Sequence, residues 1–211
     1  MVINLFKALG VAAAVLCGTA WMGTAQATPL YGTYDIKVYQ GTGDGQATNP
    51  IEQANLANPL FGTGFVTDVT YTGSLNFSPS ANTLGAFFTS GGGVFTGLGG
   101  SASNLLSTAT YGFTTLFSIT STTTGPLSGT VLHDDGASLY QFGNTVFDSS
   151  APTAATMTPY SLAAGAFNLV YVEANGLPAA LDMDAVPEPA TIAVFAIGLA
   201  GLASLRRNRL S

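Results

Sequence analysis

Hydrophobic and polar residues alternate along several segments of the chain, which is the period of a strand with one buried face. The clearest example is segment 68–78, where Val69, Tyr71, Leu75 and Phe77 fall on one face. Threonine, serine and asparagine residues occupy the positions between them. This segment is therefore predicted to be a half-buried β-strand.

Three further segments alternate in the same way. Their apolar positions are Tyr34, Ile36 and Val38; Tyr111, Phe113, Phe117 and Ile119; and Phe167, Leu169 and Tyr171. In the last segment, Val170 and Val172 make the opposite face apolar as well, which predicts a strand buried on both faces.

Between residues 28 and 185, no long window has helical periodicity, and the best helix candidate is a short one at 51–57, after Asn49 and Pro50. Glycine and proline separate the alternating segments at intervals typical of turns. The pattern predicts an all-β fold, an antiparallel β-sandwich. The Gly- and Ser-rich segment 89–103 is predicted to be a surface loop.

The N-terminus has the features of a secretory signal peptide. Lys7 precedes an apolar run, 8–18, that is too short to span a bilayer, and Ala25-Gln26-Ala27 offers small residues for signal peptidase. Residues 1–27 are therefore predicted to be removed, and an uncleaved anchor is the alternative.

The C-terminus combines three features in a fixed order. Pro187-Glu188-Pro189 precedes an uncharged run at 190–205, and Arg206, Arg207 and Arg209 follow that run. The run is predicted to be a transmembrane helix with a basic cytoplasmic tail, 206–211, because basic residues stay on the cytoplasmic side.

This arrangement resembles the PEP-CTERM sorting signal of bacteria that make exopolysaccharide. The resemblance rests on Pro187, Glu188 and Pro189, the apolar run and the arginine cluster. It implies export across the inner membrane, anchoring by the C-terminal helix and processing by exosortase. It also implies a final location at the cell surface or outside the cell. A plain tail anchor would explain the run and the arginines but not the Pro-Glu-Pro motif.

Between the two terminal signals, residues 28–181 are predicted to form the exported domain, and residues 182–189 a linker with Asp182 and Asp184. From Thr28 to Ala185 the chain has one basic residue, Lys37, and ten acidic residues. Such a domain repels phosphate backbones, so nucleic-acid binding is excluded. The only cysteine, Cys17, lies in the signal peptide, which excludes disulfides and thiolate chemistry in the mature chain.

The most distinctive internal motif is Asp134-Asp135-Gly136, within segment 132–140. The motif and the segments after it, up to the aromatic strand ending in Glu173, resemble the second half of the PA14 family of β-sandwich domains. Tyr31-Gly32-Thr33-Tyr34 is similar to the opening strand of that family.

In the lectin-like PA14 members, paired aspartates bind calcium, and the calcium holds sugar hydroxyls. By this resemblance, Asp134 and Asp135 would be calcium ligands, and Asn175 would supply a further oxygen. These are oxygen ligands of the kind that calcium prefers. The alternative is that Asp-Asp-Gly is only a turn, and no other cofactor is indicated.

Catalytic chemistry has little support in the sequence. His133 is the only histidine, no nucleophile elbow accompanies it, and no pair of acids is singled out for glycoside hydrolysis. His133 is instead predicted to be a strand residue at the mouth of the turn. The sequence favours a non-enzymatic surface or matrix protein associated with exopolysaccharide. A calcium-dependent carbohydrate-binding module is the second interpretation, and a glycosidase is the third.

Overall fold

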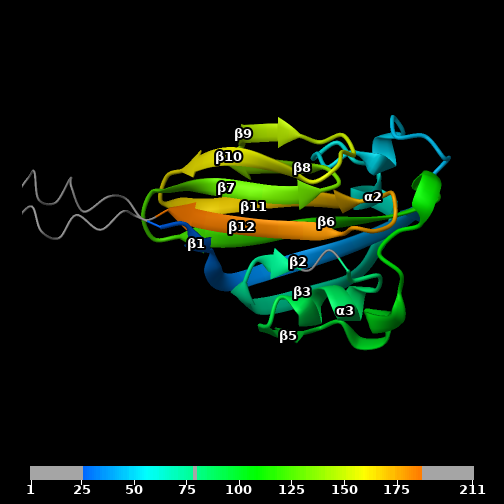
Figure 1. Ribbon diagram of the computed structural model, residues 1–211, viewed down its shortest axis with the longest axis horizontal. Helices are drawn as coiled ribbons and strands as arrows, with labels where there is room; N and C mark the ends of the chain where they lie inside the picture. Colours follow the sequence, from blue (N-terminus) through cyan, green and yellow to red (C-terminus); the bar gives the residue numbers. More distant parts are fainter. Residues whose placement is uncertain (1–25, 78–79, 187–211) are drawn as a thin grey trace, which may run out of the picture. The chain divides into compact units, whose positions relative to one another are not determined.

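Two antiparallel β-sheets pack face to face and form a sandwich (Figure 1). The computed structural model describes residues 26–77 and 80–186. The smaller sheet has the order β1-β12-β7-β10, and β4 also pairs with β12. Its strands are β1 (Thr28–Pro29), β4 (Asn76–Phe77), β7 (Leu127–Asp134), β10 (Thr156–Leu162) and β12 (Ala180–Val186).

The larger sheet has the order β5-β3-β2-β6-β11-β8-β9. Its strands are β2 (Tyr31–Thr42), β3 (Phe65–Ser74), β5 (Val94–Thr96), β6 (Phe113–Thr123), β8 (Ala137–Gln141), β9 (Asn144–Ser149) and β11 (Gly165–Glu173). The predicted all-β class and antiparallel sandwich are therefore confirmed.

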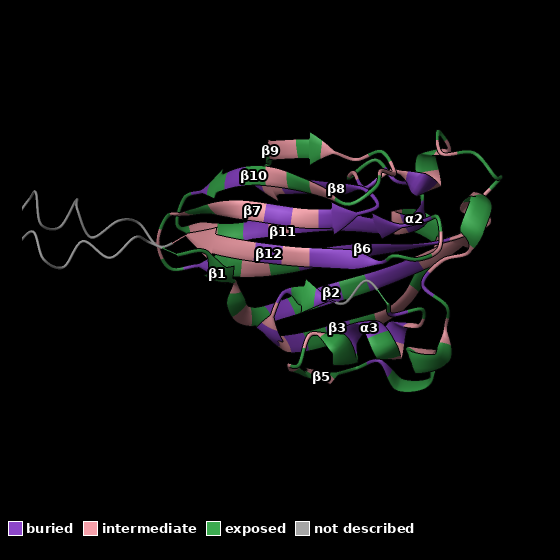
Figure 2. Ribbon diagram, viewed as in Figure 1, coloured by how far each residue is buried: buried purple, intermediate pink, exposed green. Residues whose placement is uncertain are grey.

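The main core lies between the sheets and contains most of the apolar residues that the alternation singled out, and Figure 2 colours the strands by burial. Tyr111 and Phe113 are exceptions, since both are only partly buried and lie outside this core. Val69, Tyr71, Leu75 and Phe77 are all buried, as predicted for segment 68–78. That segment forms β3 and β4 in different sheets, since β3 pairs with β2 and β4 pairs with β12.

Strand β11 is buried on both faces, as its sequence predicts. Leu169 and Tyr171 belong to the main core, whereas Val170 and Val172 belong to a second cluster on the outer face of the larger sheet. The second cluster also includes Leu60 from α2 (Leu60–Thr63). The connection between β2 and β3 thus covers one end of this sheet.

Short helices occupy the connections. In the main core, α3 (Leu84–Ser90) buries Leu84, Phe87 and Phe88, and Thr83 caps it by accepting a hydrogen bond from the Ala86 nitrogen. The remaining helices are the 3-10 turns η1 (Pro50–Glu52), η2 (Gly99–Ser103) and η3 (Ala109–Tyr111).

Several predicted boundaries were wrong. The expected helix at 51–57 is only η1, and Tyr111 lies in η3 rather than in a strand. The Gly- and Ser-rich segment 89–103 is not only a loop, because β5 pairs with β3 and η2 follows.

The predicted linker at 182–189 needs correction as well. Residues 182–186 belong to β12, which pairs with β7 from Ala180 to Val186. Apolar residues at Leu181 and Met183 point into the core and hold the strand there. The compact domain therefore extends from Ala27 to Val186.

The other predictions for the chain ends concern residues outside the described ranges. These are the signal peptide up to Ala25, the motif Pro187 to Pro189, the helix at 190–205 and the cluster Arg206, Arg207 and Arg209. Within the ranges 26–77 and 80–186, no helix is long and apolar enough to cross a membrane.

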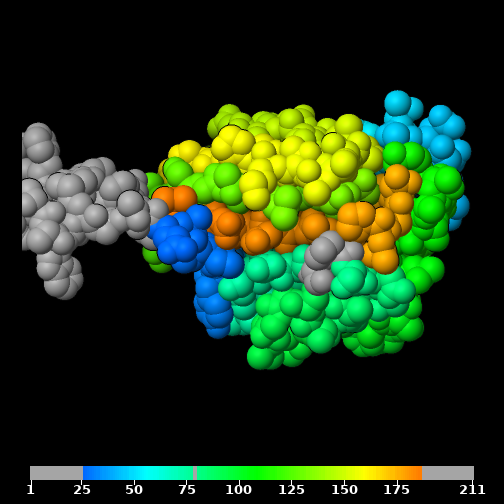
Figure 3. Space-filling view, in the orientation of Figure 1, coloured from blue at the N-terminus to red at the C-terminus, as the bar shows by residue number. Residues whose placement is uncertain are grey.

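The strand registers define two ends of the sandwich. At one end, which we call the exit pole, Thr28 pairs with Ala185, Leu162 with Leu127, and Gly165 with Thr123. Figure 3 shows the first residues of β1 beside the last residues of β12 at this end. We define the exit pole as segments 28–32, 121–127, 142–143, 162–165 and 184–186.

The opposite end we call the carboxylate pole. It contains Asp134 and Asp135 after β7, Glu173 at the end of β11, and Glu52 in η1. Both β7 and β11 begin at the exit pole and finish here, so their last residues come together although they belong to different sheets (Figure 1).

Candidate functional site

The carboxylate pole brings the three predicted calcium ligands to one cavity. Asp134, Asp135 and Asn175 all line a cavity of about 330 Å³. Its other walls come from Tyr111, from segment 152–154 and from segment 176–178. Residues distant in the sequence therefore form one site at the ends of β7 and β11.

The position of Asp135 is fixed by backbone hydrogen bonds. Its Oδ2 atom accepts from the Ala174 nitrogen at 2.8 Å and from the Asn175 nitrogen at 3.1 Å. The peptide bond between Asp134 and Asp135 is cis. The second aspartate of the Asp-Asp-Gly turn is thus the one that accepts these backbone N–H bonds.

A buried network surrounds the two aspartates. Tyr171 donates to the Asp134 carbonyl oxygen and contacts the Glu173 Oε2 atom at 3.1 Å. Ser107 donates to Glu173 Oε1 at 2.7 Å and accepts from the Gly176 nitrogen at 2.8 Å. The network holds the loops on both sides of the cavity in place.

Asn175 is held from the opposite side. Its Oδ1 atom accepts from the Thr110 nitrogen at 3.0 Å. Thr110 and Tyr111 both have positive φ angles, 64° and 55°, which are uncommon for residues with side chains. Backbone strain of this kind is concentrated at binding and catalytic sites.

Negative charge at this pole is not neutralised by side chains in the described residues. Lys37 is their only lysine or arginine, and it lies in β2 opposite Asp68 and Ser118. Burial, followed by the charge of Asp134, raises the pKa of Asp135 to about 6. Burial also raises the pKa of Asp134.

Two further acids lie beside this site, and burial favours the protonated form of each. Burial is the main cause that raises the pKa of Glu173 to about 9 and that of Glu52 to about 7. The charge of Asp135 contributes to both shifts. A cation bound between these groups would offset the repulsion that raises their pKa values.

The donor set matches the chemistry of calcium rather than zinc. Two carboxylates and one amide are hard oxygen ligands, whereas structural zinc needs histidine or cysteine. In the described ranges, no group of three His, Cys, Asp or Glu side chains could hold a metal. Backbone carbonyls, water or a bound sugar would therefore have to complete the coordination sphere.

His133 is committed to structural hydrogen bonds. It is completely buried, its Nδ1 atom lies 2.6 Å from the Asp135 carbonyl oxygen, and its Nε2 atom lies 3.0 Å from Thr158 Oγ1. The predicted position, a strand residue at the mouth of the turn, is confirmed by its place in β7. Both nitrogens are engaged, so the ring cannot also serve as a general base without losing a partner.

Two site residues were missed in the sequence. Glu173 follows Val172 at the end of a strand that is apolar on both faces. An acidic residue at the end of a buried strand indicates a buried polar site. Glu52 is completely buried in η1, where Oε2 accepts from the Thr114 hydroxyl and Oε1 has no hydrogen-bond partner. Nothing local in the sequence places Glu52 near Asp135.

Comparison with known families identifies the C-terminal segment. The PEP-CTERM protein-sorting motif matches residues 185–208. The match implies an exported protein that is sorted at the membrane and processed by exosortase. The chain matches no curated protein.

Solved structures with a similar fold share little sequence with this chain. The PA14 sugar-binding domain from an RTX adhesin is 14% identical, with a TM-score of 0.44, covering 73% of this chain and 88% of that one. The PA14 domain of the antifreeze protein MpAFP is 13% identical, with a TM-score of 0.45, covering 76% and 85%. The GH31 α-xylosidase Xac1773 from Xanthomonas citri is 11% identical, with a TM-score of 0.40, covering 79% of this chain but 16% of the enzyme.

Proposed function

We propose that the exported domain binds a carbohydrate of the cell surface or extracellular matrix at the carboxylate pole, with calcium held by Asp134, Asp135 and Asn175. The observation that carries this proposal is the convergence of these three side chains on one cavity. The sorting motif supports it, because export delivers the domain to a compartment that contains both polysaccharide and calcium.

The site residues have separable roles. Asp135 is tied to the backbone of Ala174 and Asn175, so it orders the ligand loop as well as offering its second oxygen. Asp134 makes fewer contacts and would contribute mainly charge. When bound, calcium would supply open coordination positions for a pair of sugar hydroxyls.

The rim of the cavity suits the apolar faces of a sugar ring. Tyr111 lines the cavity, and Leu177, with 56% of its surface exposed, lies on the loop after Asn175. Binding sites commonly combine such apolar walls with a few convergent polar groups. The proposed ligand is an exopolysaccharide chain, since bacteria with this kind of sorting signal make such polymers.

The proposal is tested by calorimetry and thermal unfolding with calcium. Calcium at 100 times its dissociation constant should stabilise the domain by about 2.7 kcal/mol. The variant D134N should lose most of that gain, whereas D68N, at an exposed position on β3, should keep it. Glycan binding that requires calcium and disappears in D134N would extend the result to the sugar.

Wild-type protein that shows neither calcium heat nor a thermal shift at millimolar calcium would contradict the calcium site. A matrix component without a ligand site would then be the better interpretation. Polysaccharide turnover by the purified chain, retained in D134N, would instead favour the glycosidase interpretation.

A further inference from the structure

The exit pole is the end of the domain nearest the membrane if the C-terminal apolar run anchors the chain, as the sequence predicts. Val186 is the last residue of β12, and the apolar run begins at residue 190. An extended chain covers at most about 3.6 Å per residue, so Val186 can lie at most about 14 Å from the start of that run. So short a connection keeps the exit pole close to the bilayer.

The charge distribution favours the same orientation. Asp184 is the only charged residue in the five segments of the exit pole. The carboxylate pole, in contrast, carries Asp134 and Asp135, and Asp135, with a pKa of about 6, is ionised at neutral pH. Glu173, with a pKa of about 9, is protonated there and adds no charge. Bacterial membranes carry anionic lipids, so repulsion acts on the carboxylate pole and hardly at all on the exit pole.

Phe142 is exposed at the exit pole at a cost to the domain. Phe142 and Gly143 form the two-residue connection between β8 and β9. Phe142 is 67% exposed. The φ angles are 52° at Phe142 and 77° at Gly143. A turn with two positive φ angles favours asparagine or glycine at its first position, and phenylalanine there is unfavourable.

The ring of Phe142 is held in its exposed place by the neighbouring strand. A Cβ atom added to Gly165, the first residue of β11, would lie 2.6 Å from its Cζ atom. The domain thus positions a large apolar ring at its surface without burying it.

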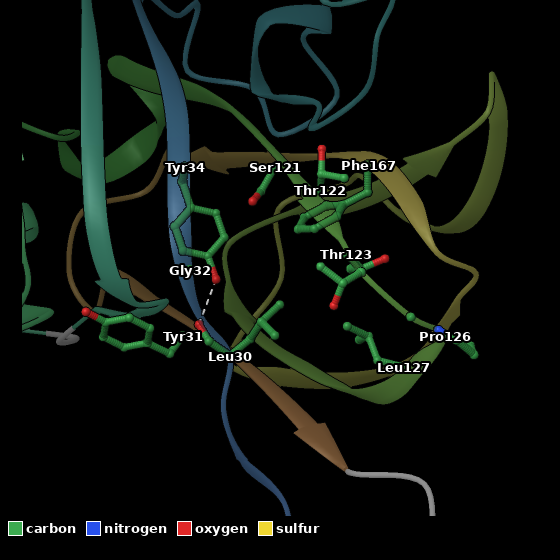
Figure 4. Close-up of a pocket in the computed structure, with 12 residues that line it drawn as sticks. Leu30, Tyr31, Gly32, Tyr34, Ser121, Thr122, Thr123, Pro126, Leu127 and Phe167 are labelled. Carbon is green, nitrogen blue, oxygen red and sulfur yellow. Dashed lines mark hydrogen bonds between the residues drawn. The ribbon is translucent and has the colours of Figure 1, made fainter.

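A second aromatic residue and an opening of the core lie at the same pole. Tyr31 is 72% exposed, and its ring points away from a cavity of about 390 Å³ (Figure 4). Leu30, Leu127 and Phe167 line that cavity, and they pack in or against the main core. Apolar surface of the core is therefore accessible from the exit pole.

We propose that the exit pole is a membrane-contact surface, in which Tyr31 and Phe142 insert into the headgroup layer of a phospholipid bilayer. Aromatic side chains are enriched at that depth, where an apolar ring and water-accessible groups are both accommodated. The inference rests on the membrane-anchored state that the sorting motif and the predicted C-terminal helix imply. If so, the orientation of the domain relative to the bilayer is fixed by the exit pole as well as by the C-terminal anchor.

Docking would fix the height of the carbohydrate site. Strand β11 runs from Gly165 at the exit pole to Glu173 at the carboxylate pole, which at about 3.3 Å per residue is roughly 26 Å. The calcium site would face away from the bilayer at about this height. It would be directed toward the extracellular polymer.

The test measures lipid contact in the full-length chain, reconstituted into vesicles of phosphatidylethanolamine and phosphatidylglycerol. In a C17S background, a fluorophore is attached at T124C in the exit pole or at T48C in the segment between β2 and β3; both positions are exposed. Lipids with a nitroxide on the headgroup should quench the label at position 124 and leave that at 48 unaffected.

The variant Y31S/F142N separates contact from mere proximity. Quenching at position 124 should fall about twofold, because the aromatic side chains no longer hold the pole in the interface. The change F142N creates the Asn-Gly sequence that this turn prefers, so the melting temperature of the variant should not fall below that of the wild type. The control L56N removes an apolar side chain at the other end, where Leu56 is 52% exposed, and should leave quenching unchanged.

Quenching at position 124 that is the same in wild type and in Y31S/F142N would overturn the inference, because tethering alone would explain it. A label protected from soluble iodide but not quenched by lipid would assign the pole to contacts between copies of the chain, which also overturns the inference.

Flotation of the vesicles reports separately on anchoring. A chain that fails to float contradicts the anchored state and the docked orientation together, whereas a floating, unquenched chain contradicts only the latter.

Discussion

The Oδ2 atom of Asp135 lies 2.8 Å from the backbone nitrogen of Ala174, which ties the turn after β7 to the end of β11 in the opposite sheet. The same oxygen accepts from the Asn175 nitrogen at 3.1 Å. One carboxylate therefore closes the sandwich at the carboxylate pole. It also sets the position of Asn175 beside the cavity.

The variant D135A should destabilise the domain in the absence of calcium by about 1–3 kcal/mol, because two backbone N–H groups lose their acceptor. Urea denaturation in EDTA measures this change. D68A, at an exposed position, is the matched control and should change the free energy of unfolding by less than about 0.5 kcal/mol. Equal stabilities of D135A and D68A would show that the bonds from Ala174 and Asn175 are not needed to close the pole.

Gly136 should not tolerate a side chain, although its φ angle is not positive. A Cβ atom there would lie 2.2 Å from the Ser150 carbonyl oxygen, which accepts a hydrogen bond from the Ala54 nitrogen. G136A should therefore cost about 1–3 kcal/mol and displace the wall of the cavity at 152–154. Thermal unfolding and calcium titration measure the two effects, and G125A, which has open space around it, is the control.

Because Glu52 is buried, the free energy of unfolding should decrease as the pH rises and this carboxyl loses its proton. Burial and the charges of Asp135 and Asp44 raise its folded-state pKa to about 7 from an ordinary value of 4.5. The folded state thus binds the proton more tightly, and the stability that this supplies is full below pH 4.5 and is lost as the pH rises through about 7.

The variant E52Q removes this titration and keeps an acceptor for the Thr114 hydroxyl. Melting temperatures of wild type and E52Q should agree near pH 4, and E52Q should melt several degrees higher at about pH 8. Other buried acids titrate in this range, so the difference between the two proteins is the quantity to compare. A constant difference at all pH values would contradict a titrating Glu52.

Phe87 should be among the most sensitive core positions. Its ring stacks on Phe77 at 4.5 Å, on Phe117 at 5.2 Å and on Tyr171 at 6.2 Å, all measured between ring centroids. F87A should lower the free energy of unfolding by about 3–5 kcal/mol. The control F65A, at a residue that is 57% exposed, should cost about 1 kcal/mol or less in the same urea titration.

The strands were predictable because burial on one face leaves a period of two in the sequence. This holds for Val69 and Tyr71 in β3 and for Leu169 in β11. The same local signal cannot show that β3 and β4 join different sheets, since strand pairing is a tertiary property. Helix α3 was missed because its seven residues are too few for a periodicity, even though Leu84, Phe87 and Phe88 have helical spacing.

The candidate site was partly predictable. Asp134, Asp135 and Asn175 came from the family resemblance, and the structure places all three around one cavity. Glu52 could not be found in this way, because it joins the pole through the fold of the connection between β2 and β3. Thr110 and Tyr111 follow ordinary strand alternation in sequence, and only the structure shows their left-handed backbone.

Thr28 pairs with Ala185 at the edge of the smaller sheet. A chain cut just before Thr28 and again within the Pro-Glu-Pro motif would therefore have its two new ends side by side, each held in a β-ladder. Exopeptidases bind several residues of free chain, and such a molecule would offer them almost none. The same pairing that completes the sheet would protect the mature protein from trimming at both ends in a medium rich in secreted peptidases.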